Sequence, residues 1–219
     1  MRRRAHRPVY VAVGASDSVG VGATRPGREA WPRVLHRTVL EPHTRFVNLA
    51  VSGATVADAL RRQVPRAETL RPALVTVWLA VNDLVAGVPA DEYEAGLSEV
   101  VGRLRAAGAG RILVGNVPYL DRMPVYVAYR EAALTGPGGA GGVWVPSPSE
   151  LNGAVDRYNA GVERVVRTHV AELVDLRVAG LAVRQAGREA ELFSGDGFHP
   201  STVGHRAIAS VFGDVVRRR

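Results

Sequence analysis

Short apolar runs alternate with longer amphipathic segments along most of this chain. The short runs are rich in valine, leucine and isoleucine, and several of them end at a glycine or a polar residue, as buried β-strands do. The third run follows Pro72 and is too short for an isolated helix. The strands expected from the pattern cover residues 9–13, 45–49, 73–80, 111–115 and 171–176.

Between these runs, apolar residues recur every three or four positions, which is the spacing of a helix with one buried face. In the segment 91–107, for example, Leu97, Val101 and Leu104 share such a face. The helices expected from this spacing cover residues 29–40, 55–62, 91–107, 150–169 and 201–216, with a short helix near 179–186.

Short buried strands that alternate with amphipathic helices favour a parallel sheet covered on both faces. We therefore expect an α/β fold: a three-layer α/β/α sandwich around a five-stranded, flavodoxin-like parallel sheet. The 219 residues suit one domain that spans residues 1–219. Ligands of such folds bind at the carboxyl ends of the strands, so the loops that leave the first three strands and the loop before the last helix should meet in one crevice.

The segment 119–149 interrupts the alternation, because glycines and prolines crowd it. We expect a long, partly flexible insertion there. Since it follows the fourth strand, it should border the crevice. Its apolar side chains, among them Tyr119, Met123 and Trp144, would either line a substrate pocket or anchor the loop onto the core.

Composition excludes several kinds of chemistry. The chain has no cysteine, which excludes disulfides, thiolate metal sites and a cysteine nucleophile. All 28 basic residues are arginines. Without lysine, a Walker-type phosphate loop and Schiff-base catalysis are excluded.

The formal charge of +7 lies at the two ends of the sequence. Arg2, Arg3, Arg4 and Arg7, together with the three arginines of 217–219, account for all of it, so residues 8–216 are formally neutral. We interpret these ends as solvated tails and expect no specific nucleic-acid partner; binding of nucleic acid or membrane surfaces through the tails is an alternative.

No apolar stretch approaches the ~20 residues that span a bilayer, so we expect no membrane span. The apolar run 9–13 is also short for the core of a signal peptide. We expect a cytoplasmic protein, with secretion left open.

Ser16 follows the first strand within a glycine-rich loop, Gly14–Gly22. A serine at a tight turn after a buried strand can be exposed as a nucleophile. The same loop could instead cradle a phosphate or form a simple turn.

The loops after strands two and three carry two candidate hydrogen-bond donors. The backbone N–H of Gly53 could face the crevice, although Ser52 or Thr55 could equally mark a capped helix start. The side-chain amide of Asn82 could donate to a developing oxyanion, although Asn82 and Asp83 could also form a simple turn.

Asp196 and His199 lie just before the last helix. A carboxylate three residues before a histidine can fold back onto the imidazole Nδ1–H and leave Nε2 free as a base. Pro200 and Ser201 are also signals of a helix start, and both interpretations can hold together. The other histidines, which we interpret as surface or helix-face residues, are His6, His36, His43, His169 and His205.

These four segments, in this order, resemble the sequence blocks of the SGNH hydrolase family, which includes the GDSL lipases and esterases. The resemblance covers nearly the whole chain. It implies a catalytic triad and an oxyanion hole formed by the N–H groups of Ser16 and Gly53 and the amide of Asn82. The triad that it implies is Ser16, Asp196 and His199.

The chain departs from the family pattern at two positions. Ala15 replaces the aspartate before the nucleophile, and Ala80 replaces the glycine before Asn82. Neither change removes a catalytic group. The first leaves a second alignment open, in which Asp17-Ser18 is the block and Ser18 is the nucleophile; we favour Ser16, which keeps the loop glycines aligned.

The resemblance implies a serine hydrolase that cleaves a small-molecule ester and needs no metal or organic cofactor. We favour small or short-chain acyl esters, because nothing in the sequence suggests a large lipid-binding cap or a carbohydrate module. Lysophospholipase, thioesterase and carbohydrate acetylesterase activities occur in the same family and are alternatives. A non-catalytic, flavodoxin-like nucleotide-binding domain is a further alternative that explains the glycine loop but not Asp196 and His199.

Overall fold

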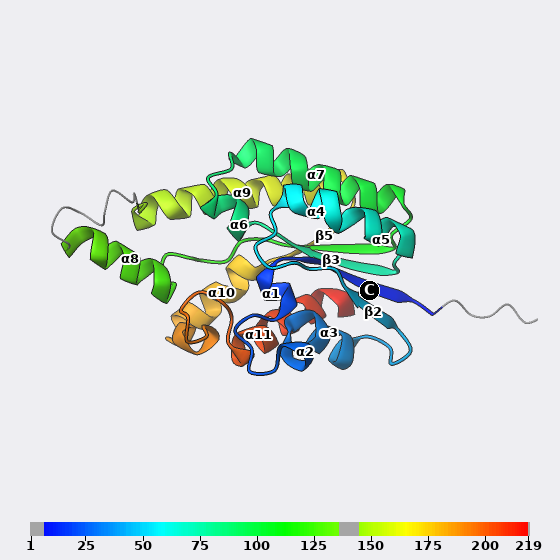
Figure 1. Cartoon of the computed structure of the whole chain (residues 1–219), viewed down its shortest axis with the longest axis horizontal. Helices are drawn as coiled ribbons and strands as arrows, with labels where there is room; N and C mark the ends of the chain where they lie inside the picture. Colours follow the sequence, from blue (N-terminus) through cyan, green and yellow to red (C-terminus); the bar gives the residue numbers. More distant parts are fainter. Residues whose placement is uncertain (1–6, 136–144, 219) are drawn as a thin grey trace, which may run out of the picture.

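A parallel sheet lies at the centre of the structure, a computed structural model that describes residues 7–135 and 145–218 (Figure 1). The strands pair in the order β2-β1-β3-β4-β5, and every pairing is parallel. The strand order changes direction between β1 and β3, which opens a crevice at the carboxyl ends of these two strands. The strands are β1 (Val9–Gly14), β2 (Arg45–Asn48), β3 (Leu74–Trp78), β4 (Arg111–Gly115) and β5 (Glu172–Val174).

Helices cover both faces of the sheet (Figure 1). The upper face in this view carries α4 (Val56–Arg62), α5 (Val64–Leu70), α7 (Ala90–Ala106) and α9 (Pro148–Thr168). The lower face carries α3 (Trp31–Val39), α10 (Leu176–Gln185) and α11 (Thr202–Arg217). The remaining helices are α1 (Ser16–Val19), α2 (Pro26–Glu29), α6 (Val81–Val85), α8 (Pro124–Thr135) and the 3-10 helix η2 (Glu189–Leu192).

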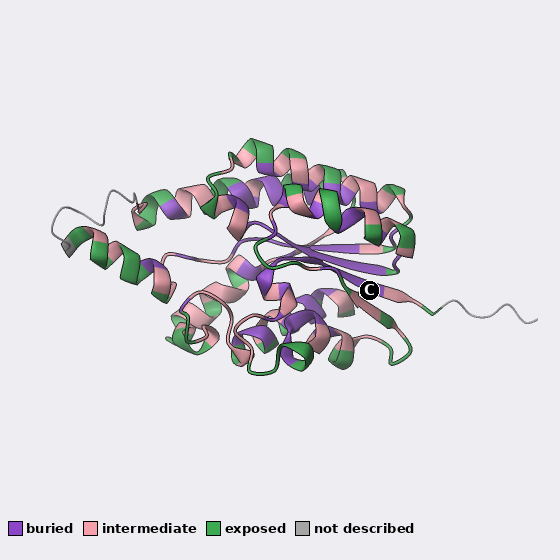
Figure 2. Ribbon diagram, viewed as in Figure 1, coloured by how far each residue is buried: buried purple, intermediate pink, exposed green. Residues whose placement is uncertain are grey.

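The central strand β3 separates two apolar cores. Val75 and Val77 are fully buried in the core beneath α4, α7 and α9, whereas Trp78 belongs to the core formed with α3 and α11. In the second core, the ring of Trp31 stacks on Phe212 with centroids 4.2 Å apart. Because both faces are covered, the strand is buried along its whole length (Figure 2), and its sequence is almost entirely apolar.

Local capping explains where α4 and α9 begin. At the start of α4, the Thr55 hydroxyl accepts the N–H of Asp58, and the Asp58 carboxylate accepts the N–H of Thr55. Ser147 and Glu150 form the same reciprocal capping box at the start of α9. Each box satisfies two backbone donors that a helix end otherwise leaves unpaired.

The expected fold is confirmed: a five-stranded parallel sheet in three layers. The differences are helices where none was expected, such as α1 in the serine loop, α5 directly after α4, and α8 in the 119–149 segment. A four-residue helix such as α1 is too short to show a periodic pattern. The pattern of α8 is weak because, among its described side chains, only Tyr126 is buried.

Candidate active site

Ser16 lies where the chain turns from β1 into α1. Gly14 ends the strand, Ala15 is extended with φ −115° and ψ −150°, and Ser16 begins the short helix. Ser16 is 7% exposed and lines a depression of about 10 Å³ together with Asn82 and Phe198. A space of this size holds about one water-sized group.

The serine loop touches the loop that carries His199. Gly22 has a φ of +88°, and a Cβ atom there would overlap the carbonyl of Pro200 and lie 3.0 Å from the Cβ of His199. A residue with a side chain would therefore push the two loops apart. Among the described residues, no hydrogen bond joins Ser16 Oγ to the imidazole of His199, so their proximity rests on this contact between the loops.

The imidazole of His199 is held by Asp196. His199 Nδ1 lies 2.7 Å from Asp196 Oδ2, while Asp196 Oδ1 accepts the backbone N–H groups of Phe198 and His199, both at 2.9 Å. The Ser194 hydroxyl also donates to Oδ1 at 2.7 Å. Gly197, with a φ of +67°, allows the tight turn that folds the carboxylate back onto the ring.

These hydrogen bonds set the charge of the pair. Burial alone would raise the pKa of Asp196, but the bonds from His199, from the two backbone N–H groups and from Ser194 outweigh it and lower that pKa well below its usual range. An ionised Asp196 accepts the Nδ1 proton of His199. The Nε2 of His199 is then the free basic nitrogen.

His205 lies on a helix face, one of the two places expected from the sequence, but this is the inner face of α11 and not the surface. It is fully buried, and its Nε2 donates to the carbonyl of Val21 at 3.0 Å. Burial lowers the pKa of His205, which favours the neutral form of the ring. His205 thus joins α11 to the serine loop without facing the site.

Asn82 and Asp83 join the end of β3 to the turn after β2. The Asn82 Nδ2 donates to the carbonyl of Ala54 at 2.9 Å, and both carboxylate oxygens of Asp83 lie 3.1 Å from the N–H of Val56. Burial raises the pKa of Asp83 to about 6. Gly53, with a φ of +77°, lies in this turn but lines a neighbouring depression rather than the one formed by Ser16 and Asn82.

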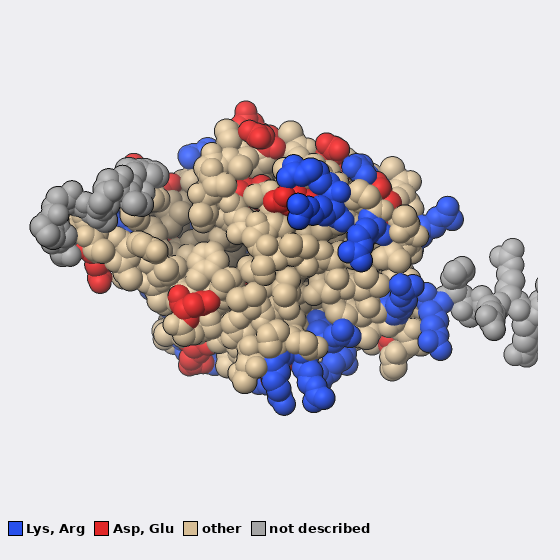
Figure 3. All heavy atoms as spheres, in the orientation of Figure 1, with Lys and Arg blue, Asp and Glu red and all other residues tan. Residues whose placement is uncertain are grey.

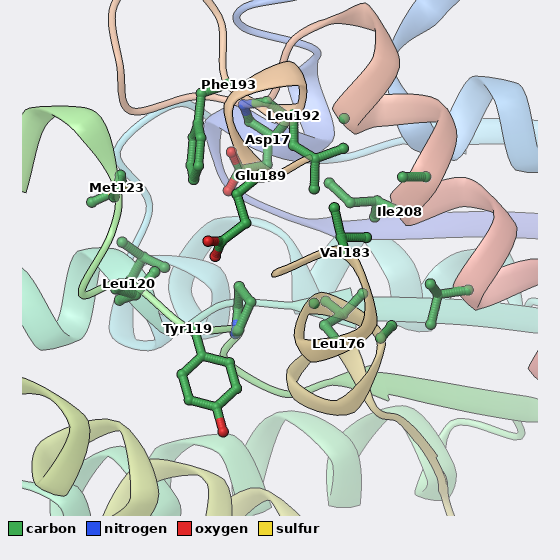
Figure 4. A pocket seen from close by; sticks show the side chains of 18 of the residues that line it. Asp17, Tyr119, Leu120, Met123, Leu176, Val183, Glu189, Leu192, Phe193 and Ile208 are labelled. Atoms are coloured by element: carbon green, nitrogen blue, oxygen red, sulfur yellow. The ribbon is translucent and has the colours of Figure 1, made fainter. Parts of the chain in front are cut away.

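A larger, apolar cavity of about 170 Å³ adjoins the serine depression (Figure 4). Four residues line both spaces: Asp17, Trp78, Val81 and Phe198. The cavity extends from there between α10, η2 and α11. Its wall includes Leu120, Met123, Leu176, Val183, Leu192, Phe193 and Ile208.

Two acidic side chains also face this apolar cavity. Glu189 extends into it in Figure 4 and is bound by Arg184 at 2.8 Å. Asp17 lies at the boundary with Ser16, and no ion pair involves it among the described residues. Burial raises the pKa of Asp17 to about 6, although the nearby His199 acts in the opposite direction.

The 119–149 segment contributes to both the cavity and the histidine loop. Tyr119 and Met123 line the cavity, and the ring of Tyr119 lies beneath the guanidinium of Arg177, 3.8 Å from the ring centre. At the start of α8, the N–H of Val125 donates to the carbonyl of Gly197 at 3.1 Å. Trp144, the third candidate pocket residue, lies outside the described residues.

Sequence reasoning missed most of the cavity. The wall from α10 and η2 follows β5, in a segment that shows no polar motif. Asp17 could have been noticed as a charged residue directly after the serine, but the cavity that it borders is completed by α11 and η2, far along the chain. No group of three or more His, Asp or Glu side chains in the described residues is arranged to hold a metal ion.

The arginine-rich surface lies apart from the cavity. Figure 3 shows arginines gathered over α2 and on the side of α4, whereas the hollow beside α8 is bordered mainly by uncharged atoms. At the other end of the sheet, Arg111, the first residue of β4, donates to the carbonyls of Val215 and Val216. Arg217 and Arg218 therefore lie near the amino end of β4, at the end of the sheet opposite Ser16. In the described part of the chain, no helix has the length and apolar character needed to cross a membrane.

Comparison with known proteins gives one family. Residues 12–207 match the GDSL-like Lipase/Acylhydrolase family. An arylesterase from Vibrio mimicus is 27% identical over 100 residues, which cover 45% of this chain and 50% of that protein. The esterase TesA from Pseudomonas aeruginosa is 27% identical over 117 residues, which cover 52% of this chain and 57% of that protein. The chain spans about half the length of the curated relatives it matches.

Solved structures share the fold over nearly the whole chain. A catalytic mutant of an acetylxylan esterase from Geobacillus stearothermophilus matches with a TM-score of 0.71 at 21% identity, over 97% of this chain and 95% of that one. The esterase EstA from Pseudoalteromonas sp. matches with a TM-score of 0.69 at 18% identity, over 96% and 97%. At these identities the likeness concerns the fold alone.

Proposed function

Because the chain belongs to the GDSL-like lipase/acylhydrolase family, we propose that it hydrolyses carboxylic esters with a triad of Ser16, His199 and Asp196. The observation that carries the proposal is the 2.7 Å bond between His199 Nδ1 and Asp196, next to the serine loop. This bond leaves the imidazole Nε2 as a base, which a serine nucleophile requires.

In the first step of the proposed reaction, His199 Nε2 accepts the proton of the Ser16 hydroxyl as its oxygen attacks the ester carbonyl. The resulting tetrahedral intermediate collapses, and the alcohol leaves with the proton from His199. Water then attacks the acyl-serine with His199 again as the base, which releases the carboxylic acid and restores Ser16. Asp196 balances the charge of the imidazolium in both steps.

The oxyanion of the intermediate needs donors. We assign this role to the N–H groups of Ser16 and Gly53 and to the side-chain amide of Asn82. The depression lined by Ser16 and Asn82 supports two of these assignments, since it is sized for one oxygen atom. Gly53 lines a neighbouring depression and is linked to this one through Ala54, whose carbonyl accepts a hydrogen bond from Asn82. Each donor would contribute roughly 3 kcal/mol to the transition state.

Burial favours Ser16 over Ser18 as the nucleophile. Ser18 is 0% exposed and lines neither of the two spaces that Asp17 borders. Its hydroxyl lies beneath the strand end, where a Cβ atom on Gly14 would overlap it. Ser16, by contrast, borders the depression directly.

The apolar cavity supports an acyl-binding role. It begins at Phe198, beside Ser16, and an acyl chain bound to the serine would extend into it. This arrangement suits small or short-chain acyl esters and leaves room for more than an acetyl group. The relatives include an arylesterase and an acetylxylan esterase, so aryl esters and sugar acetates are the first alternatives to simple alkyl esters.

Hydrolysis of p-nitrophenyl acetate, butyrate and octanoate by the wild type, Ser16→Ala and Ser18→Ala tests the proposal. We expect Ser16→Ala to abolish activity and Ser18→Ala to retain most of it. Full activity in Ser16→Ala would exclude the proposed triad. A fluorophosphonate probe should label the wild type and not Ser16→Ala; a nucleotide-binding domain without a nucleophile would not be labelled at all.

A further inference from the structure

Gln63 forms a closed pair of hydrogen bonds with the backbone of Gly14, two residues before Ser16. Its Oε1 accepts the N–H of Gly14, and its Nε2 donates to the carbonyl of Gly14, both at 2.9 Å. The side chain is 1% exposed. The pair therefore fixes both polar groups of one peptide position at the point where the strand becomes the serine loop.

Gly14 needs such a partner because β2 leaves the sheet beside it. The register between β1 and β2 ends at Ala12 and Asn48. Beyond that point, Val51 N–H still donates to the Gly14 carbonyl at 3.2 Å, but the chain then turns away toward Gly53. Gln63 supplies the acceptor that a continuing strand would have offered to the N–H of Gly14.

The break between α4 and α5 places Gln63 for this contact. Its backbone N–H donates to the carbonyl of Ala59 in α4 at 2.8 Å, and its own carbonyl accepts the N–H of Ala67 in α5 at 2.9 Å. Both backbone groups of Gln63 are therefore hydrogen-bonded, one to each helix. Pro65, near the start of α5, has no N–H to continue the ladder of α4. The side chain of Gln63 remains free to reach the strand end.

Gln63 also lies against the turn that carries Gly53. It lines the same depression as Gly53 and Ala54. The carbonyl of Gly14 accepts both from Gln63 and from Val51, the residue that begins this turn. One buried amide therefore connects the serine loop and the glycine turn, which carry two of the three proposed oxyanion donors.

We propose that Gln63 is a positioning residue that holds the backbone N–H groups of Ser16 and Gly53 at the spacing required by the oxyanion. The inference rests on the proposed ester hydrolysis. Oxyanion donors act only when they are fixed where the charge develops, and a displacement of about 1 Å can reduce the rate roughly 10²-fold.

A second clamp in the fold provides a control for a purely structural role. Asn159 pairs with the backbone of Val117 in the same way: its Oδ1 accepts the N–H at 2.8 Å, and its Nδ2 donates to the carbonyl at 2.9 Å. This clamp is also buried, but it holds the chain just after β4, and among the described residues neither Asn159 nor Val117 forms a hydrogen bond with the serine loop.

Gln63→Glu tests the inference, because a protonated glutamic acid keeps one donor and one acceptor and can form the same pair. An ionised one has two acceptors and repels the carbonyl of Gly14. Burial raises the pKa of such a carboxyl. We expect kcat for p-nitrophenyl acetate, relative to the wild type, to fall at least tenfold from about pH 6 to about pH 9 with KM unchanged.

Three further variants complete the design, each assayed where circular dichroism shows it folded. Gln63→Leu should lower kcat roughly 10- to 100-fold at every pH. Asn159→Asp should show its pH dependence in thermal stability and not in kcat for the acetate ester. Gln185→Glu, an exposed site on α10, should match the wild type at every pH.

The outcomes separate the inference from the function on which it rests. The positioning role would be overturned, with the esterase left intact, by any of three results. These are a kcat of Gln63→Glu, relative to the wild type, that does not change with pH; a change confined to KM; or an equal effect on kcat in Asn159→Asp. A wild type without hydrolysis or fluorophosphonate labelling would overturn both. If Gln63→Leu does not fold, the pH dependence of kcat in Gln63→Glu, relative to the wild type, still decides the question.

Discussion

A larger side chain that enters the apolar cavity from α10 should strongly lower kcat/KM for esters with long acyl chains and leave kcat/KM for acetate esters nearly unchanged. Gly180 lines the cavity, and a Cβ atom there would lie 4.0 Å from the Cβ of Pro118, an ordinary van der Waals contact. A larger side chain at this position therefore enters the cavity without displacing backbone. We predict the consequence for Gly180→Leu.

The size of the effect follows from the number of acyl methylenes that the new side chain would displace from the cavity, whose volume is about 170 Å³. Each buried methylene contributes about 0.8 kcal/mol, or roughly fourfold in kcat/KM. A leucine side chain takes the place of about three acyl methylenes, so the octanoate ester should lose roughly 2.4 kcal/mol, or about 60-fold in kcat/KM. The acetate ester, whose acyl group ends near Phe198, should change less than about twofold.

The assay compares kcat/KM for the acetate, butyrate and octanoate p-nitrophenyl esters. Ala182→Leu is the matched control, because Ala182 is exposed on the same helix. Gly180→Ala should keep the chain-length profile and gain about 0.5–1 kcal/mol of stability from the better helix former. Equal losses on acetate and octanoate, or an unchanged octanoate rate in Gly180→Leu, would show that the acyl chain does not occupy this cavity.

Two further predictions concern the acidic residues of the site. The pKa of Asp17 is about 6 in the folded protein, above its unfolded value of about 4, so the folded state binds more protons and loses stability as pH rises between these values. Asp17→Asn should remove that loss, and its gain in Tm should be larger at pH 7 than at pH 4; a gain independent of pH would contradict the burial argument. Asp196 has a lowered pKa, so its stabilising contribution is present above about pH 4 and is lost as pH falls further. Asp196→Asn should lower kcat roughly 10⁴-fold by changing the imidazole tautomer, and its deficit in Tm should shrink in acid; activity near the wild-type value would exclude Asp196 from the triad.

Much of the architecture could be predicted because its signals are local. The apolar runs that became β1 and β3, and the helical spacing of α7, are set by neighbouring residues in the sequence, and the parallel order follows from their alternation. Asp196 and His199 could be singled out for the same reason. They are three residues apart, and the 2.7 Å bond between them closes within a single turn.

The features that needed the tertiary structure involve residues far apart in the chain. Gln63 is 49 residues from Gly14, and no pattern in α4 indicates that its side chain would meet the strand end. His205 is 184 residues from Val21, and the hydrogen bond between them depends on the packing of α11 against the serine loop.

The apolar cavity also could not be predicted from the sequence. Its walls come from the ends of β3 and β4 and from α10, η2 and α11, and its apolar residues look like ordinary core residues in the sequence. Whether an apolar side chain fills the core or borders an empty space depends on how completely neighbouring elements pack, which hydrophobic periodicity does not encode. The sequence alone determined the layers and the polar residues at the strand ends. Tertiary packing decided which serine borders the depression, which loop lies against it, and how large the apolar cavity beside it is.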